Sequence, residues 1–130
     1  MKRNLTALGL LGVGSAVTAA TLPPLIANSG GLWEVSRSAT GANSERRCVP
    51  NAASLSQWEH RQNQCTRLVL SSTETSAVIN YTCPKGGFGR STIKVITPRT
   101  LRIETQGIGT DGFPFNYTLH ARRVGDCPAH

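Results

Sequence analysis

Four arginines close to the first two cysteines are the residues of this chain whose type and spacing best suit ligand binding. The set consists of Arg46, Arg47, Arg61 and Arg67. If Cys48 and Cys65 were bridged, all four guanidinium groups would gather on one edge of the domain. Guanidinium groups bind phosphate and carboxylate groups through paired hydrogen bonds. The four arginines are therefore a candidate anion-binding edge, while a solvated basic edge that binds nothing is the favoured interpretation.

Residues for acid-base or metal chemistry are few and scattered. The three histidines, His60, His120 and His130, do not have the spacing of metal ligands. No serine lies in a G-x-S-x-G context, and the only aspartates are Asp111 and Asp126. We interpret His60 and His120 as surface residues. We expect a protein that is not an enzyme and that has no catalytic residue, no metal site and no cofactor.

The four cysteines predict two disulfides. They are Cys48, Cys65, Cys83 and Cys127, an even number in a small chain, and none forms a C-x-x-C pair of the kind that binds zinc. Four cysteines allow three pairings, which spacing alone leaves open. We favour Cys48–Cys65 with Cys83–Cys127, because the first bridge would join the two ends of a helix and the second would tie the C-terminal tail to the sheet.

The N-terminal segment has the pattern of a secretory signal peptide over residues 1–20. Lys2 and Arg3 precede a short apolar run that ends in small residues at Ala19 and Ala20. A membrane anchor is the alternative, but the apolar run is short for a span and the pair Pro23–Pro24 soon follows it. We therefore expect localisation in the periplasm, or secretion, with no transmembrane span in the mature chain. Residues 21–29 should form a flexible segment, and residues 30–130 a single domain.

The positive charge favours anionic partners. The chain has 14 basic and 7 acidic residues, and without Lys2 and Arg3 the count becomes 12 basic against 7 acidic, a formal charge of +5. An exported basic surface suits phospholipid headgroups, other anionic envelope components or an acidic envelope protein, and makes nucleic acid an unsuitable partner. We expect a monomer.

Alternating apolar residues predict a β-rich fold. Runs such as Ile93–Val95 and Phe115–Tyr117–Leu119 alternate with polar residues, as in strands with one buried face. Asn51 can begin a helix that ends near Asn63. The predicted fold is α+β: a curved antiparallel β-meander of about six or seven strands with one helix packed on it and two disulfides.

The turn around Pro98 allows a prediction of strand register. A loop of three residues, 98–100, would place Val95 opposite Ile103 and Lys94 opposite Glu104. A loop of two residues would place Lys94 opposite Ile103 and mix the two faces of the sheet. Because a slip of one residue moves every side chain to the other face, we predict the three-residue loop.

Several short motifs follow one another in a fixed order: Gly31-Leu32-Trp33-Glu34-Val35, Cys48-Val49-Pro50 before a helix, Cys65, Tyr81-Thr82-Cys83, and Arg122-Arg123-Val124-Gly125-Asp126-Cys127. Together they resemble the domain of unknown function 3617 family, which consists of small exported proteobacterial proteins. The resemblance covers the chain from Gly31 to Cys127. It implies a periplasmic location and a β-rich fold, and it transfers no catalytic residue.

The strand with Tyr81 and Cys83 and the closing Cys127 are also similar to periplasmic inhibitors of lysozyme. The chain lacks their Ser-Gly-rich inhibitory loop, and its positive charge would repel a basic lysozyme. The leading hypothesis is therefore a non-enzymatic binding or accessory module for an anionic or amphiphilic ligand. An inhibitor or partner protein of a cell-envelope enzyme is the alternative, and a small hydrolase ranks third.

Overall fold

The computed structural model describes residues 20–129, so the predicted signal peptide lies outside the described residues except for Ala20, and His130 lies outside them too. The described part contains seven strands and two short helices. The strands are β1 (Gly31–Ser36), β2 (Glu45–Val49), β3 (Thr66–Thr73), β4 (Ser76–Thr82), β5 (Phe88–Thr97), β6 (Thr100–Ile108) and β7 (Pro114–Gly125). The helices are α1 (Pro24–Ala27) and the 3₁₀ helix η1 (Ala52–His60). None of them is long and apolar enough to cross a membrane.

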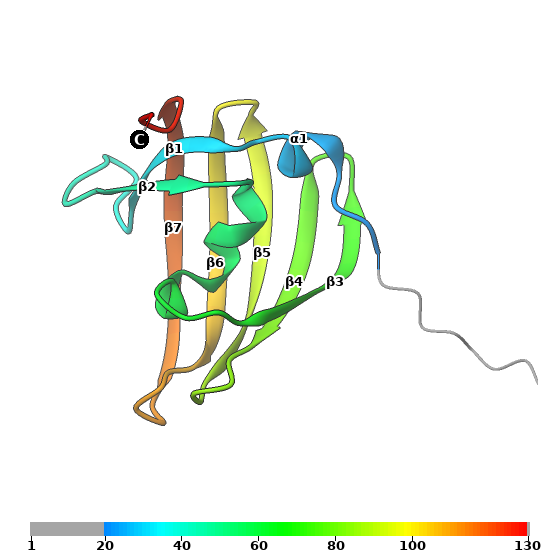
Figure 1. Cartoon of the computed structure of the whole chain (residues 1–130), viewed down its shortest axis with the longest axis vertical. Coiled ribbons are helices and arrows are strands. Elements are labelled where there is room, and N and C mark those ends of the chain that lie inside the picture. Colours follow the sequence, from blue (N-terminus) through cyan, green and yellow to red (C-terminus); the bar gives the residue numbers. More distant parts are fainter. Residues whose placement is uncertain (1–19, 130) are drawn as a thin grey trace, which may run out of the picture.

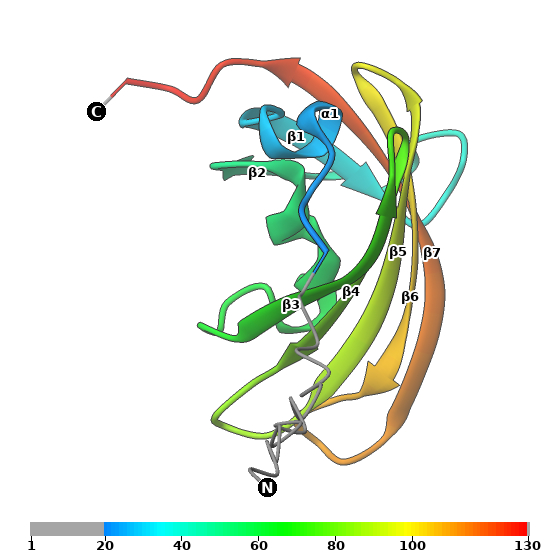
Figure 2. The same ribbon diagram turned by 90° about the vertical axis from the view of Figure 1, so that its right-hand side faces the viewer.

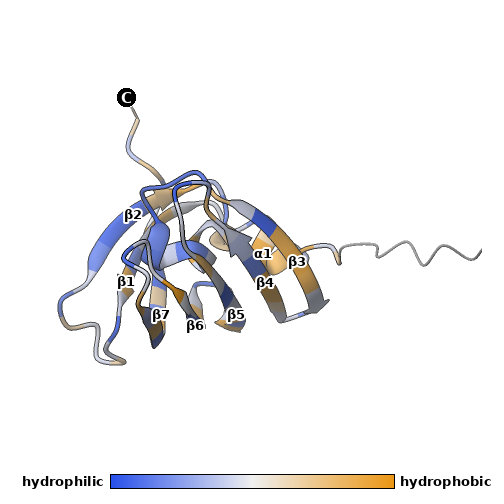
Figure 3. Cartoon of the chain, turned by 90° about the horizontal axis from the view of Figure 1, so that it is seen from below, coloured by the Kyte–Doolittle hydropathy of each residue, from blue (hydrophilic) through white to orange (hydrophobic). Residues whose placement is uncertain are grey.

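All seven strands form one antiparallel sheet in the order β2-β1-β7-β6-β5-β4-β3. The sheet curls strongly, so that β1 and β2 cross in front of β5, β6 and β7 (Figure 1), and the curl is clear from the side (Figure 2). Seen from below, the strands form an arch whose two edges differ, because β2 is hydrophilic and β3 has a hydrophobic stretch (Figure 3). The predicted α+β meander with a packed helix and two disulfides is confirmed.

Alternation places the core on the inner face of the sheet, the face that η1 covers. One register row runs across four strands as Ala77, Ile93, Ile103 and Leu119, and each of these side chains is fully or almost fully buried. Trp33 is buried beside them. Because strand side chains alternate between faces, the residues next to this row point outward and are available for binding.

The helix begins where the sequence predicts and ends earlier. The Asn51 side chain accepts a hydrogen bond of 3.0 Å from the backbone N–H of Ala53, which confirms it as the N-cap. The helix ends at His60, and the Gln57 amide donates to the carbonyl oxygens of His60 and Asn63. Its Leu55 and Trp58 side chains are buried, as a helix packed on the sheet requires.

The segment before β1, which we expected to be flexible, forms part of the core. In α1 the Ile26 side chain is fully buried. The Ser29 hydroxyl accepts from the backbone N–H of Ala52 at 2.8 Å, and the Trp33 indole donates to the Ser29 carbonyl at 2.9 Å. These contacts fix the segment because they satisfy buried polar groups of both η1 and β1.

The disulfides join Cys48 to Cys127 and Cys65 to Cys83, so the favoured pairing was wrong. The strand order gives the reason. Leu32 of β1 lies opposite Cys48 on one side and Gly125 on the other, which brings the C-terminal tail near Cys48. Cys65 and Cys83 lie just outside the first residue pair of β3 and β4, and their Cα atoms are 4.2 Å apart.

The three-residue loop predicted between β5 and β6 was also wrong. Thr97 pairs with Thr100 across a two-residue loop, and Val95 lies opposite Leu101. A β-bulge at Ile96 takes up the extra residue, so the apolar side chains of both strands still share the inner face. The Ile96 side chain is 63% exposed at this end of the sheet.

Candidate functional site

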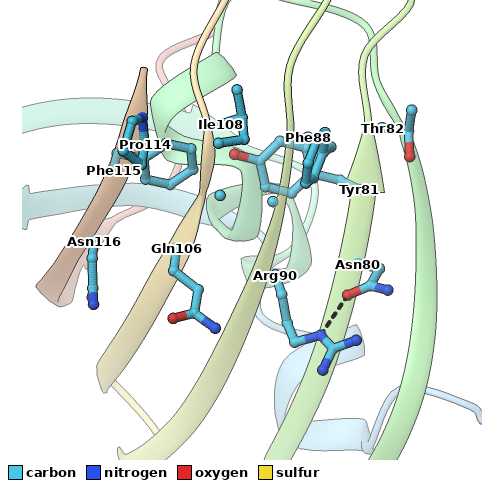
Figure 4. Close-up of a pocket in the computed structure, with 12 residues that line it drawn as sticks. Asn80, Tyr81, Thr82, Phe88, Arg90, Gln106, Ile108, Pro114, Phe115 and Asn116 are labelled. Atoms are coloured by element: carbon cyan, nitrogen blue, oxygen red, sulfur yellow. Dashed lines mark hydrogen bonds between the residues drawn. The ribbon is translucent and has the colours of Figure 1, made fainter. Parts of the chain in front are cut away.

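A depression with a volume of about 650 Å³ lies on the outer face of the sheet, opposite η1 (Figure 4). Strands β4, β5, β6 and β7 supply its walls. Two register rows cross these strands next to each other: a polar row of Asn80, Arg90, Gln106 and Asn116, and a row of Thr82, Phe88, Ile108 and Pro114. We call this feature the outer depression.

The polar row centres on one cation. The Nε of Arg90 donates to the Asn80 side-chain oxygen at 2.9 Å, which fixes the direction of the guanidinium (Figure 4). Among residues 20–129, no carboxylate lies within ion-pair distance of Arg90. The side chain is exposed, so its terminal N–H groups can donate to an incoming anion.

The second row is mostly apolar and faces water. Phe88 is 54% exposed, although it is one of the largest side chains in the sheet. Ile108 and Pro114 continue the row on the neighbouring strands. An apolar strip beside a row of hydrogen-bonding groups is the composition of many small-ligand sites.

Two glycines separate these rows. Gly89 and Gly107 lie opposite each other on β5 and β6 and line the outer depression. A Cβ atom on Gly107 would overlap the Phe88 carbonyl oxygen, and one on Gly89 would come within 2.6 Å of the Tyr81 ring. Glycine is required at both positions because the backbone and an aromatic ring approach so closely.

A buried His–Tyr pair lies beneath these glycines. His60 is 3% exposed, and its Nδ1 is 2.8 Å from the Tyr81 hydroxyl, so the prediction of a surface residue was wrong. The rings of Tyr81 and Phe115 meet the imidazole edge to face. Within the described chain, Nε2 of His60 has no hydrogen-bond partner, and it packs against Gly87.

Burial keeps both groups of this pair neutral near neutral pH. Desolvation lowers the pKa of His60 below its usual 6.5, and the carboxylates of Glu59 and Asp111 oppose this shift more weakly. Desolvation also raises the pKa of Tyr81, so its hydroxyl stays protonated. Both groups are therefore neutral and serve to fill the space under the glycines. His120, in contrast, is half-buried on the outer face of β7.

Three of the four arginines of the predicted anion-binding edge share one cleft. Arg47, Arg61 and Arg67 line a cleft of about 470 Å³ beside η1. Arg46 lies on the opposite face of β2, where its Nε is 3.4 Å from Glu34. The three are close together even though the bridge between Cys48 and Cys65, which motivated the prediction, does not exist.

Each of the three arginines in this cleft already bonds to other residues of the fold. Nε of Arg61 is 2.9 Å from Glu45, and Arg47 donates to the carbonyl oxygen of Arg61 at 2.9 Å. Arg67 donates to the Gln57 side-chain oxygen. Arg61 also donates to the Trp58 carbonyl oxygen, so Arg47 and Arg61 satisfy backbone carbonyl groups at the end of η1. Anion binding at this edge stays a prediction.

Sequence reasoning did not find the outer depression, although one signal for it was present. Gly89 and Gly107 interrupt segments of otherwise strand-like residues, and an isolated glycine in a strand indicates close approach of another group. The glycine-rich run from Lys85 to Gly89 has a composition typical of a flexible turn, which hides this signal. The structure places Gly89 inside β5.

Residues 26–127 match the family described as protein of unknown function (DUF3617). The chain belongs to this family. The match begins at Ile26 in α1 and ends at Cys127, which is bonded to Cys48. It therefore includes every strand and all the residues that line the outer depression. The family description assigns no activity. Searches of curated proteins and of solved structures give no match.

Proposed function

We propose that this member of the DUF3617 family is an exported, non-enzymatic binding module that holds an anionic amphiphile in the outer depression. The observation that carries the proposal is the position of Arg90. This exposed cation has no carboxylate partner among the described residues, and it lies in the register row next to that of Phe88. A ligand with an acidic headgroup and an apolar chain matches these two rows. The two disulfides are consistent with an oxidising compartment, such as the periplasm.

The composition of the walls supports an acidic headgroup. Asn80, Gln106 and Asn116 bring neutral donors and acceptors next to Arg90, and no acidic side chain lines the outer depression. The bidentate guanidinium would carry most of the attraction, while the carboxamides would orient the headgroup. The apolar chain would lie over Phe88 and Ile108 and cover surface that now faces water.

Non-enzymatic binding fits the groups near the site. His60 and Tyr81 are neutral and lie below the glycines, and Nε2 of His60 faces Gly87. A general base has to reach the proton that it removes. His60 does not line the outer depression, and the hydroxyl of Tyr81, which does line it, stays protonated and is bonded to His60.

The first experiment is native mass spectrometry of protein purified from periplasm at low salt, followed by identification of the released small molecules. A bound amphiphile of fixed stoichiometry is the expected result. Repeated spectra of ligand-free protein, together with no binding of added dodecanoate, would overturn the proposal.

A titration then tests the role of Arg90. The charged probe is dodecanoate, and the uncharged probe is dodecanol. Arg90→Gln should weaken dodecanoate binding about tenfold or more, because it removes charge-assisted hydrogen bonds, and should change dodecanol binding little. Arg99→Gln is the matched control, since Arg99 is an exposed arginine in the loop at the opposite end of β5. Equal losses for both variants would show that only net charge matters.

A second function, partner of an envelope protein, is favoured by β3. This strand lies at the edge of the sheet, and its Leu68 and Leu70 side chains are 47% and 39% exposed. Exposed strand edges can pair with a strand of another protein. The N-terminal segment already occupies part of this edge, because the Ala20 N–H donates to the Val69 carbonyl. Leu68→Lys would abolish such a complex and leave dodecanoate binding unchanged.

A further inference from the structure

Two hairpin loops at the lower end of the sheet display aromatic side chains. The β4–β5 loop (residues 83–87) leads into Phe88, and the β6–β7 loop (residues 109–113) ends at Phe113. Phe113 is 70% exposed and Phe88 54%. Both loops lie at the bottom of the molecule in Figures 1 and 2, and the pairs Phe88–Ile108 and Ile108–Pro114 make them neighbours. We call Lys85, Phe88 and Phe113 the aromatic tip.

The loop conformation holds Phe113 out in the solvent. The Asp111 carboxylate accepts from the backbone N–H of Phe113 at 2.9 Å, and the Gly109 N–H donates to the Phe113 carbonyl at 2.8 Å. Gly112 adopts φ 82°, and nothing lies within 4 Å of where its Cβ would be. Both backbone groups of Phe113 are therefore bonded within the loop, while its ring contributes nothing to the core. A large apolar ring held in this way indicates a contact surface.

The aromatic tip has a small positive charge, because Lys85 and Arg90 stand against the single carboxylate of Asp111. Lys85 is the only basic residue of the two loops, and Arg90 follows one register row above Phe88. Asp111 is their only acidic residue, and its carboxylate is bonded to the backbone of its own loop. Without Lys2 and Arg3 of the predicted signal peptide, the chain has a formal charge of +5. Negative surfaces attract such a region, and aromatic rings settle at the level of lipid headgroups.

We propose that the aromatic tip docks on an anionic lipid bilayer, with the ring of Phe113 inserted at the headgroup level. Two separate rings on loop ends are a small apolar area for a protein interface, which usually requires a broad continuous patch. Insertion into a bilayer requires no matching partner surface. Ile108 and Pro114 connect the tip to the outer depression, so docking would bring the depression to the bilayer surface.

Vesicle flotation with the full chain tests this inference. The probes are vesicles of phosphatidylethanolamine and phosphatidylglycerol in a 3:1 ratio, and neutral phosphatidylcholine vesicles. We expect binding to the anionic vesicles that weakens with added salt, and about tenfold or greater loss with Phe113→Ser. Ile96→Ser is the matched control, because Ile96 is 63% exposed at the opposite end of the sheet and should not contribute. Thermal unfolding of both variants checks that they fold.

A tryptophan at the tip gives an independent measurement. The fluorescence of Phe113→Trp should shift to shorter wavelength on addition of anionic vesicles, and that of Ile96→Trp should not. Trp33 and Trp58 are buried and provide a constant background. Absence of vesicle binding by the wild-type chain, or equal losses for Phe113→Ser and Ile96→Ser, would overturn the inference. So would binding by Phe113→Ser as strong as that of the wild type.

The docking inference goes beyond the proposed function and can be tested apart from it. Phe113 does not line the outer depression, so Phe113→Ser should retain dodecanoate binding. Vesicle binding without dodecanoate binding would uphold the docking and refute the ligand. Dodecanoate binding without vesicle binding would uphold the ligand and refute the docking.

Discussion

Nδ1 of His60 and the hydroxyl of Tyr81 lie 2.8 Å apart beneath two strand glycines, and the other ring nitrogen of His60 has no hydrogen-bond partner among the described residues. This relationship joins the last turn of η1 to β4 across the inner face of the sheet. Burial favours the neutral form of this imidazole, because a charged ring would lose more hydration than the attraction of the Glu59 and Asp111 carboxylates offsets.

The buried imidazole should make the folding equilibrium depend on pH. Burial lowers the pKa of His60 below 6.5 in the folded protein, so the unfolded chain binds a proton more readily. The contribution to stability is complete above pH 6.5 and decreases as the pH falls below that value. For one proton this slope cannot exceed about 1.4 kcal/mol per pH unit. Urea unfolding of the wild type between pH 7.5 and 5 measures it.

Two variants identify the group that causes this slope. His60→Asn should flatten the dependence, whatever it does to stability at pH 7.5. His120→Asn should retain it, because His120 lies on the outer face. An unchanged slope in His60→Asn would assign the effect to another group.

Gly107 should not tolerate a side chain. Gly107→Ala would force a methyl group against the Phe88 carbonyl and should lower the free energy of unfolding by about 1–3 kcal/mol. Gly125→Ala is the matched control in β7, because nothing lies within 4 Å of its Cβ position. Urea unfolding of both variants makes the comparison. A neutral effect of Gly107→Ala would mean that β5 and β6 lie further apart than described.

Ile26 should contribute to stability as a core residue does. Ile26→Ala is expected to lower the free energy of unfolding by about 2–4 kcal/mol, because the side chain is fully buried. Leu25→Ala in the same short helix should cost far less, since Leu25 is 42% exposed. Equal and small decreases in the free energy of unfolding for both variants would mean that residues 21–29 are flexible, as the sequence predicted.

The disulfide pairing can be read directly from a tryptic digest without reduction. Cleavage after arginine and lysine separates the four cysteines into the peptides 48–61, 62–67, 68–85 and 124–130. We expect mass spectrometry to find 48–61 joined to 124–130, and 62–67 joined to 68–85. Linkage of 48–61 to 62–67 would contradict the fold at β1.

The sequence predicted the strands well because their signal is local. Residues such as Ile93 and Leu119 alternate with polar neighbours, and each lies on the buried face as expected. The helix start at Asn51 was also predictable, since the cap is a contact between residues two apart. These features depend on spacing within one element.

The remaining features depend on which strands are neighbours. Insertion of β1 between β2 and β7 brings Cys48 to Cys127, and nothing within a few residues of either cysteine encodes that. His60 becomes buried only because Tyr81 and Phe115 arrive from β4 and β7. The outer depression likewise combines four strands. The bulge at Ile96 was missed because alternation does not reveal an extra residue.

The position of β1 between β2 and β7 determines the order in which the two disulfides of this chain can form. A chain that emerges with its N-terminus first exposes Cys48, then Cys65, long before Cys127. Oxidation in order of appearance would join the first two and trap a bond that the finished sheet does not contain. The native pairing therefore requires either a delay until β7 has docked on β1, or an isomerase that reopens the early bond. For this domain, the timing of oxidation is part of the folding problem.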